Sequence, residues 1–463
     1  MGGQRRAAGA GESVAPRGWP AVALLAAAAS AIYLALALAG DLRQRFPELL
    51  AAYAALSGAM LLAWRLVRRE GRLLPWAAAA AVLFRLAALS GAPALSDDVQ
   101  RYVWDGRVQL HGVHPYRHAP LDPEVAPLRD RDFDSLNHPA VKTIYPPLAQ
   151  LFFMALAGLG AGPPGFKLAS GLLDCAVILA LDRLLRRRAL PRDRLILYAW
   201  NPLAVLETAG SGHLEPLGVL LVILAGTWII ERRPVLATLA LAASVQVKLL
   251  PVVLAPALLR RVGLRAGLPA FGLGLLALAL PYAATGPAIG GGSFDYAERW
   301  EHNAVIYDAV EHGLERVDAG SRLGALLARL HARLGDAGLP WEWLHHRAAA
   351  RDLARVGVAL AATAWVLAVC RRRLDLPAEA LLATGGVLLL SPTLHPWYLL
   401  WVLPWAAAGA SRGWLLLAGT VVLSYANPAG DVPVPLKVLE FGPPLALAAW
   451  DRWRSAADRR GGA

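Results

Sequence analysis

Long apolar runs, separated by short blocks of arginine, are the feature that most constrains what this chain can fold into. Runs at 19–39, 73–95, 235–259 and 264–284 approach or exceed the roughly 20 residues that a helix needs to cross about 30 Å of hydrocarbon. A backbone in lipid must satisfy its own polar groups, so such runs must be helical. The sequence therefore predicts an all-α integral membrane protein, with 1–463 forming a single polytopic domain.

Composition supports this fold class and argues against a nucleic-acid partner. Charged residues make up 17% of the chain, whereas soluble proteins carry about 25%. The formal net charge is +12, and many of the arginines are grouped between apolar runs. Such arginines hold the cytoplasmic loops of a membrane protein in place. The expected partner is therefore the lipid bilayer, and no nucleic acid is expected.

The arginine blocks also predict the topology. They lie at 65–72, 186–194, 260–265, 371–373 and 452–460. Positively charged loops stay in the cytoplasm, so both termini are expected on that side of the cell inner (plasma) membrane. The chain then crosses an even number of times, and we expect about twelve to fourteen transmembrane helices.

Two large loops differ from the others in charge. Residues 96–145 hold eight acids against six bases, and residues 286–350 hold nine acids against six bases. Both loops are expected on the extracytoplasmic side. The first loop is expected outside and the next arginine block, at 186–194, in the cytoplasm, so the chain between them must cross the membrane an odd number of times. Its sequence at 145–185, however, reads as two apolar segments. One of the two is therefore expected to be re-entrant or interfacial. Leucines at helical spacing over 323–334 predict an amphipathic helix on the outer membrane surface or capping the bundle.

The densest cluster of polar side chains covers 96–107 and is followed by Gly-Val-His-Pro-Tyr at 112–116. If the first segment is helical, Asp98, Arg101 and Asp105 share one face. A carboxylate there suits general-base work on a hydroxyl group, and a guanidinium suits a phosphate. The alternative is an interfacial helix whose aspartates and arginines only pair with one another.

Three further clusters place polar groups in or beside apolar runs, where such groups are costly. The segment 201–215 is short and glycine-rich, which is typical of segments that line cavities but also fits an ordinary tight loop. Lys248 lies deep in an apolar run and must snorkel, form an ion pair or bind an anion. At 391–398 the tryptophan fits an aromatic belt, while His395 is better suited to holding a phosphate or acting as an acid. Internal pairing is expected for Arg85, Asp174 and Asp182.

Several function classes lack their sequence signatures. The chain has no Walker loop, no GxGxxG, no HExxH and no cysteine-based metal site, which argues against a nucleotide-driven pump and a zinc protease. No metal ligand is predicted. Cys175 and Cys370 lie inside apolar runs, where a disulfide would not staple an exposed loop.

The order of the polar clusters resembles that of the GT-C glycosyltransferases, specifically the bacterial polyprenyl-phosphate-mannose-dependent mannosyltransferases. The resemblance covers about residues 80–410 and rests on RYVWDGR, GVHPY, YPPLAQ, WNPLAVLETAGSGH, VKLLP and LHPWYLLWVLP, in this order. The acidic loop here follows the third apolar run, while the family usually places it after the first. Two additional N-terminal helices account for this difference. The resemblance implies a GT-C-like helical bundle that transfers a hexose, with mannose as the family-level expectation.

The resemblance also implies the substrates and the roles of individual residues. A polyprenyl-phosphate sugar donor is reached from the membrane, and a lipid, glycan or protein acceptor enters from the extracytoplasmic side. The implied base is an aspartate of the first large outer loop, Asp98 or Asp97, which activates the acceptor hydroxyl for an inverting attack. Arg101, Lys248 and His395 are the candidates for contact with the donor phosphate. No organic cofactor is needed, and dependence on a divalent metal is left open. The remaining predicted substrate-binding residues are Tyr102, Asp105, Arg107, Tyr116, Tyr145, Glu207, His213, Glu215, Trp397 and Tyr398.

The main alternative is a polytopic transporter or lipid flippase. Such a protein is expected to show inverted repeats with charged residues near the bilayer midplane, and no internal symmetry is apparent here. A second alternative is a non-catalytic membrane assembly subunit. Such a subunit would tolerate neutral substitutions throughout 97–107, whereas an enzyme would not.

Overall fold

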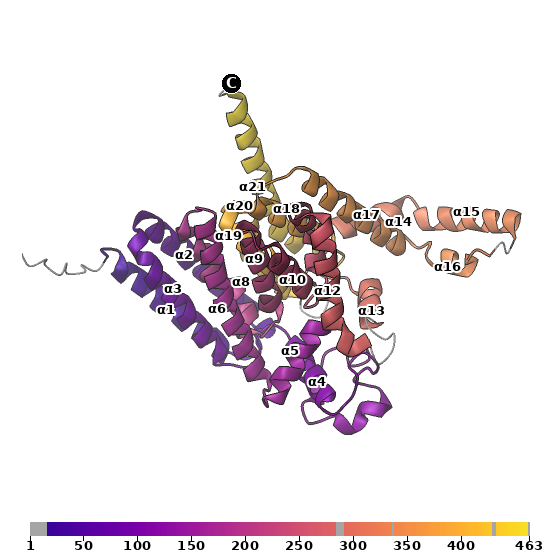
Figure 1. Ribbon diagram of the computed structural model, residues 1–463, viewed down its shortest axis with the longest axis horizontal. Coiled ribbons are helices and arrows are strands. Elements are labelled where there is room, and N and C mark those ends of the chain that lie inside the picture. The colour runs from indigo at the N-terminus through magenta and orange to yellow at the C-terminus, as the bar shows by residue number, and fades with distance from the viewer. Residues whose placement is uncertain (1–15, 284–290, 336–337, 428–431, 462–463) are drawn as a thin grey trace, which may run out of the picture.

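The chain forms an all-helical bundle in a computed structural model that describes residues 16–283, 291–335, 338–427 and 432–461 (Figure 1). Among these residues the regular elements are helices, and one isolated bridge joins His302 to Thr393. The predicted all-α fold class is therefore confirmed. Parts of the second large loop, at 286–290 and 336–337, lie outside the described residues.

Four long helices form one side of the bundle (Figure 1). They are α1 (Trp19–Leu38), α2 (Phe46–Arg69), α3 (Leu74–Leu89) and α6 (Pro163–Arg187). The predicted internal pairing of charges is confirmed between these helices, because Nε of Arg85 donates to Asp174 at 2.8 Å and both side chains are buried. Asp182 pairs with Arg192 at 2.8 Å.

The remainder of the bundle consists of further helices of varied length, joined by turns. They are α9 (Glu215–Ile230), α10 (Pro234–Val245), α11 (Ala255–Val262), α12 (Leu264–Ala283), α17 (Ala350–Arg371), α18 (Leu376–Leu390), α19 (Leu403–Gly409), α20 (Arg412–Thr420) and α21 (Val434–Gly461). Short 3-10 turns interrupt them at η7 (Leu250–Leu254), η8 (Pro396–Trp401) and η9 (Val421–Ala426). Proline starts or interrupts many of these elements because it lacks the N–H that a helix interior needs.

Five helical stretches of the described chain are long and apolar enough to cross a membrane: α1, α2, α3 with its preceding turn, α12 and α17. The other apolar helices have 10–17 residues. The structure thus agrees with a polytopic membrane protein, and the expected number of about twelve to fourteen crossings stays a prediction.

The segment after the first large loop contains one helix that is too short to cross a bilayer. The helix α5 (Pro147–Gly158) has 12 residues and is about 18 Å long, whereas α6 has 25 residues. This length agrees with the expectation that one of the two segments is re-entrant or interfacial. The helix α4 (Asp98–Leu110) packs closely against α5. A Cβ at Gly106 would lie 2.3 Å from the carbonyl oxygen of Phe153, so this contact requires glycine.

The second large loop contains four helices, which extend to one side of the bundle (Figure 1). They are α13 (Gly291–Arg299), α14 (Ile306–Arg316), α15 (Ala319–Leu334) and α16 (Trp341–His346). No residue of α15 is buried, and Leu326, Leu330 and Leu334 are exposed. The predicted helix over 323–334 is therefore present, while its contact with the outer membrane surface stays a prediction.

Candidate active site

A polar cavity of about 280 Å³ lies where the start of α4, the loop that follows it and the segment 391–398 meet. In Figure 1 this end of the bundle, marked by α4 and α5, lies opposite the C-terminus. The charged and imidazole side chains that line the cavity are Arg43, Asp97, Asp98, Arg101, His138, Lys142, Lys248, His302 and His395. Four of them are lysine or arginine and two are aspartate, so the lining carries an excess of positive charge. Such a lining favours an anionic group.

Asp98 is the first residue of α4 and is held from three directions. Its backbone N–H donates to Oγ of Ser96 at 3.2 Å, which fixes the start of the helix. Its Oδ1 accepts a hydrogen bond from Nδ2 of Asn137 at 2.7 Å, and its Oδ2 lies 3.8 Å from Nδ1 of His213. The carboxylate is 20% exposed and lines the cavity. Among the described residues no lysine or arginine pairs with it, so it can accept a proton from a group bound in the cavity.

Asp97 has a different environment, although it is the preceding residue. Its Oδ2 lies 2.8 Å from Nη1 of Arg43, and Arg43 also pairs with Asp41 at 2.9 Å. Arg43 belongs to the turn η1 (Leu42–Gln44), which joins the first two helices. The N-terminal helices therefore contribute a cation to the cavity wall, and this cation neutralises Asp97 rather than Asp98.

Behind Asp98, His213 connects the cavity to a fully buried carboxylate. Nε2 of His213 lies 3.3 Å from Oε2 of Glu207, whose Oε1 accepts a hydrogen bond from the hydroxyl group of Tyr425 at 2.6 Å. Glu207 lies in a π-helical turn, η6 (Leu206–Gly210), and His213 lies in the following loop. Burial lowers the pKa of His213, but Glu207, Glu215 and Asp98 outweigh burial and raise it above the usual value. The imidazolium form is thus favoured between two carboxylates.

Arg101 lines the cavity, but much of its guanidinium is already engaged. Its Nε donates to Asp105 at 2.9 Å, and both side chains are buried. Asp105 also accepts hydrogen bonds from Thr143 at 2.5 Å and Gln150 at 2.9 Å. The sequence left open that the aspartates and arginines of this helix only pair with one another. Arg101 and Asp105 do form such a pair, whereas Asp98 does not pair with an arginine of the helix.

Lys248 follows α10 and presents its ammonium group to the cavity. Its Nζ lies 2.6 Å from Oε1 of the buried Glu215 and 3.8 Å from the centroid of the Tyr398 ring. The carboxylate and the face of the ring hold the cation in one place. One face of the ammonium group therefore remains directed at the cavity, where an anion can reach it.

Four rings are stacked in a row, and His302, His395 and Trp397 among them line the cavity. The ring centroids are 4.6 Å apart for His302 and His395, 4.4 Å for His395 and Trp397, and 4.2 Å for Trp397 and His213. The bridge at His302 fixes the second large loop to the segment that carries His395. Burial, together with His302 and Lys248, holds the pKa of His395 well below its usual range. His395 is therefore neutral near pH 7 and has one ring N–H to donate.

The other predicted residues fall into two groups. Tyr145, Trp397 and Tyr398 line the cavity. Tyr102 and Tyr116 are buried outside it, Tyr102 stacking on Phe153 and Tyr116 donating to the carbonyl oxygen of Tyr145 at 2.7 Å. Arg107 pairs with Asp130 beside a separate shallow cavity. Among the described residues that line the polar cavity, Tyr102, Tyr116 and Arg107 are therefore not included.

Several residues of the site were not predicted from the sequence, among them Arg43, Asn137, His302 and Tyr425. Arg43 and Tyr425 come from the turns η1 and η9, and Asn137 and His302 come from loops. None of them belongs to a motif or to a regular pattern, so the sequence contained no signal for them beyond their polarity.

A second cavity lies beside the first and is apolar. It measures about 450 Å³ and lies between α17 and α18. Tyr296, Trp300 and Tyr398 line both cavities, and the hydroxyl groups of Tyr296 and Tyr398 are 2.5 Å apart. The pair of cavities can hold a molecule with a charged head and an apolar tail.

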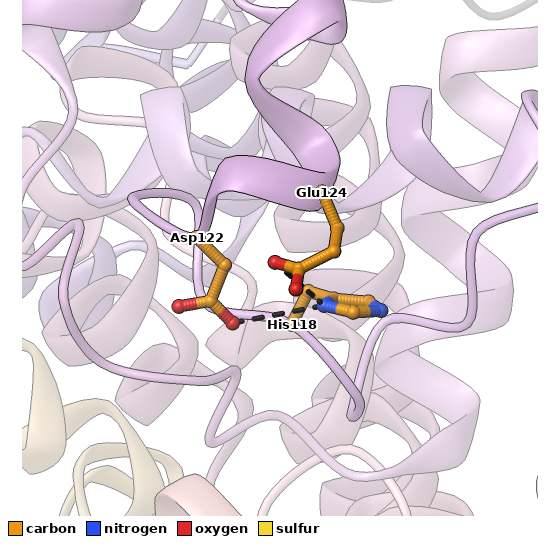
Figure 2. Close-up of side chains that lie close together, drawn as sticks. All are labelled: His118, Asp122 and Glu124. Atoms are coloured by element: carbon orange, nitrogen blue, oxygen red, sulfur yellow. Dashed lines mark ion pairs between the residues drawn. The ribbon is translucent and has the colours of Figure 1, made fainter.

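Within the described residues, one group of three side chains has the spacing of metal ligands. It consists of His118, Asp122 and Glu124 in the first large loop (Figure 2). None of the three lines the polar cavity.

Comparison with known families gives two matches. The sequence model of glycosyltransferase family 87 matches residues 143–392. The model described as alpha-(1->6)-mannopyranosyltransferase, N-terminal domain, matches residues 18–262. No curated protein sequence and no solved structure matches the chain. The two family matches overlap, and together they cover the polar cavity except for Trp397, Tyr398 and the other lining residues after 392.

Proposed function

Because the chain belongs to glycosyltransferase family 87, we propose that it transfers mannose from a polyprenyl-phosphate donor to an acceptor hydroxyl on the extracytoplasmic side of the membrane. The family matches support a mannosyltransferase, and the apolar helices make it a membrane protein. The observation that carries the proposal is the position of Asp98, a carboxylate without a lysine or arginine partner among the described residues, in a cavity lined by cations.

The apolar cavity between α17 and α18 accounts for the lipid part of the donor. Its lining includes Val358, Ala359, Ala362, Val387 and Leu390. A prenyl chain that enters between these helices from the bilayer would leave its phosphate near Tyr296 and Tyr398, which line both cavities. The hydrophobic effect favours burial of such a chain by about 25 cal/mol for each square ångström of apolar surface.

The cations of the polar cavity account for the phosphate. Lys248 supplies a point charge, neutral His395 supplies a ring N–H, and Arg101 supplies the donors that Asp105 does not use. The leaving polyprenyl phosphate gains negative charge as the glycosidic bond breaks, and preorganised donors stabilise that charge without reorganising. We place the sugar between these groups and Asp98.

Asp98 is the proposed general base. In an inverting transfer, the acceptor oxygen attacks the anomeric carbon, its proton passes to Asp98, and the bond from the anomeric carbon to the phosphate oxygen breaks with its electron pair. Asn137 and His213 orient the carboxylate through its two oxygens. Glu207 supports the charge on His213. Asp97 is the weaker candidate because Arg43 already neutralises it.

Transfer by the purified protein tests this function. The protein in lipid nanodiscs would be incubated with radiolabelled polyprenyl-phosphate mannose and a panel of lipid, glycan and peptide acceptors. We expect a labelled product whose anomeric configuration is inverted relative to the donor. If the wild-type protein transfers sugar from no prenyl-phosphate donor, the proposal is rejected.

Labelling of a single cysteine tests the side of the membrane. Cys175 and Cys370 would be replaced by serine, and Arg131, whose side chain is 92% exposed in the first large loop, by cysteine. A membrane-impermeant maleimide should label intact cells at this position. Labelling only after the membrane is opened would place the loop in the cytoplasm and overturn the proposed sidedness.

A further inference from the structure

A histidine and two carboxylates converge in the first large loop, outside the polar cavity. Nδ1 of His118 lies 3.7 Å from Oδ2 of Asp122 and 3.8 Å from Oε2 of Glu124. One ligand atom from each of the three residues lies within 4.8 Å of the others. Figure 2 shows both carboxylates directed at the same ring nitrogen. We propose that these three side chains bind one divalent transition-metal ion.

The distances favour a shared ion over direct contact. Hydrogen bonds between nitrogen and oxygen atoms are about 2.7–3.2 Å long, so the imidazole does not bond directly to either carboxylate. A zinc ion lies about 2.0–2.2 Å from nitrogen and oxygen ligands, which leaves the ligand atoms themselves roughly 3–4 Å apart. The separations of 3.7 and 3.8 Å between the imidazole nitrogen and the two carboxylates match this second arrangement. Among the described residues, no lysine or arginine pairs with Asp122 or Glu124, so their charge remains available to a cation.

Hydrogen bonds to backbone groups hold the segment that carries the three ligands. Arg129 donates to the carbonyl oxygens of Pro120 at 3.1 Å and Asp122 at 3.0 Å. Glu124 is the second residue of the 3-10 turn η3 (Pro123–Leu128), and Oδ2 of Asp122 accepts from the backbone N–H of Ala119 at 3.0 Å. These hydrogen bonds restrict the segment that carries the three ligands, and such restriction lowers the entropy lost on binding.

The ligand set selects the type of metal. Magnesium and calcium prefer oxygen ligands throughout, whereas an imidazole nitrogen favours zinc, copper, iron or nickel. Three protein ligands leave at least one coordination position for water. The partial exposure of the three side chains provides a path for the ion.

The ion would brace the wall of the active site rather than take part in the reaction. The N–H of Leu121, between two of the ligands, donates to the carbonyl oxygen of Pro139 at 2.8 Å. Two residues before Pro139, Asn137 donates to Asp98. Fixing residues 118–124 therefore restricts the segment that orients the proposed base. This last step depends on the proposed function, whereas metal binding does not.

Zinc binding to the purified, full-length protein in detergent tests the proposal. After removal of metals with a chelator, titration calorimetry should show one zinc site that His118→Ala or Glu124→Gln weakens at least about tenfold. Asp132→Asn is the matched control, because Asp132 is an exposed carboxylate of the same loop that lies outside the cluster. This control should bind zinc as the wild type does.

Hydrogen exchange provides a second readout that does not require activity. Zinc should slow amide exchange over 118–139 in the wild type and leave it unchanged in Glu124→Gln. The proposal is overturned if metal-free wild type binds no zinc, if both cluster variants bind zinc normally, or if magnesium binds at these residues as tightly as zinc. Normal mannose transfer by a protein that fails this test would leave the proposed function intact.

Discussion

Nη1 of Arg43 lies 2.8 Å from Oδ2 of Asp97, while the neighbouring Asp98 faces Asn137 and His213 instead. The two aspartates are adjacent in the sequence, yet only one of them is paired with a guanidinium. Arg43 comes from the turn between the first two helices. The N-terminal segment of the chain therefore distinguishes the two carboxylates.

The first prediction concerns these two aspartates. Asp98→Asn should lower kcat by about 10²–10⁴-fold, because a general base contributes this much to a proton transfer. Asp97→Asn should lower it by less than about tenfold, since the ion pair with Arg43 is partly exposed and such pairs contribute about 1 kcal/mol or less. The measurement is transfer of labelled mannose. Full activity in both variants would move the base elsewhere, with Glu207 and Glu215 as the next candidates.

The second prediction concerns Lys248. Lys248→Met should lower kcat by about 10²–10³-fold, the usual cost of removing one group that stabilises a developing oxyanion. It also leaves Glu215 buried without its cation, so the protein should become less stable. The double variant Lys248→Met, Glu215→Gln serves as the control. Its melting temperature should recover while its activity stays low; recovery of activity would show that Lys248 has only a structural role.

The third prediction concerns pH and His213. The pKa of His213 is raised in the folded protein, so its contribution to stability is complete below the unfolded pKa of about 6.5 and is lost as pH rises through the folded pKa. The wild type should therefore exceed His213→Gln in melting temperature by more at about pH 6 than at about pH 9. The check is thermal unfolding of both proteins in detergent across this range. An equal difference at both ends would contradict a charged His213.

The fourth prediction concerns the apolar cavity. Ala362→Phe, on its lining, should raise KM for long-chain polyprenyl donors more than for a short-chain donor, because the added ring occupies space proposed for the distal prenyl units. Ala364→Phe lies on the same helix and does not line the cavity, so it should leave both KM values unchanged. Steady-state kinetics with donors of two chain lengths separate the cases. An equal effect on both donors would place the lipid in another groove.

The fifth prediction concerns the contact between α4 and α5. Gly106→Ala places a methyl group against the carbonyl oxygen of Phe153 and should destabilise the protein by about 1–3 kcal/mol, as overpacking of a core does. Gly58 lies in the middle of α2, and a Cβ there meets no atom within 4 Å. Gly58→Ala should leave stability unchanged or raise it slightly. Unfolding monitored by tryptophan fluorescence compares the two variants, and equal stability would rule out the tight helix contact.

The sequence by itself determined the fold class and the positions of most helices. Hydrophobicity and helical spacing are local properties, so the apolar runs and the amphipathic helix over 323–334 could be read from neighbouring residues. The lengths of the helices could not be read from the sequence, because the turns η7, η8 and η9 divide apolar runs that look continuous. Hydropathy averages over such turns and does not detect them.

Only the tertiary structure decided how the polar residues combine. Asp98, Lys248 and His395 were predicted individually, and their shared cavity depends on the path of the whole chain. The partners that set their chemistry come from distant positions: Arg43 is 54 residues from Asp97, and Tyr425 is 218 residues from Glu207. Charge interactions act through space over a few ångströms, irrespective of separation along the chain. A sequence pattern can therefore identify a carboxylate, but the folded structure determines whether a cation neutralises it.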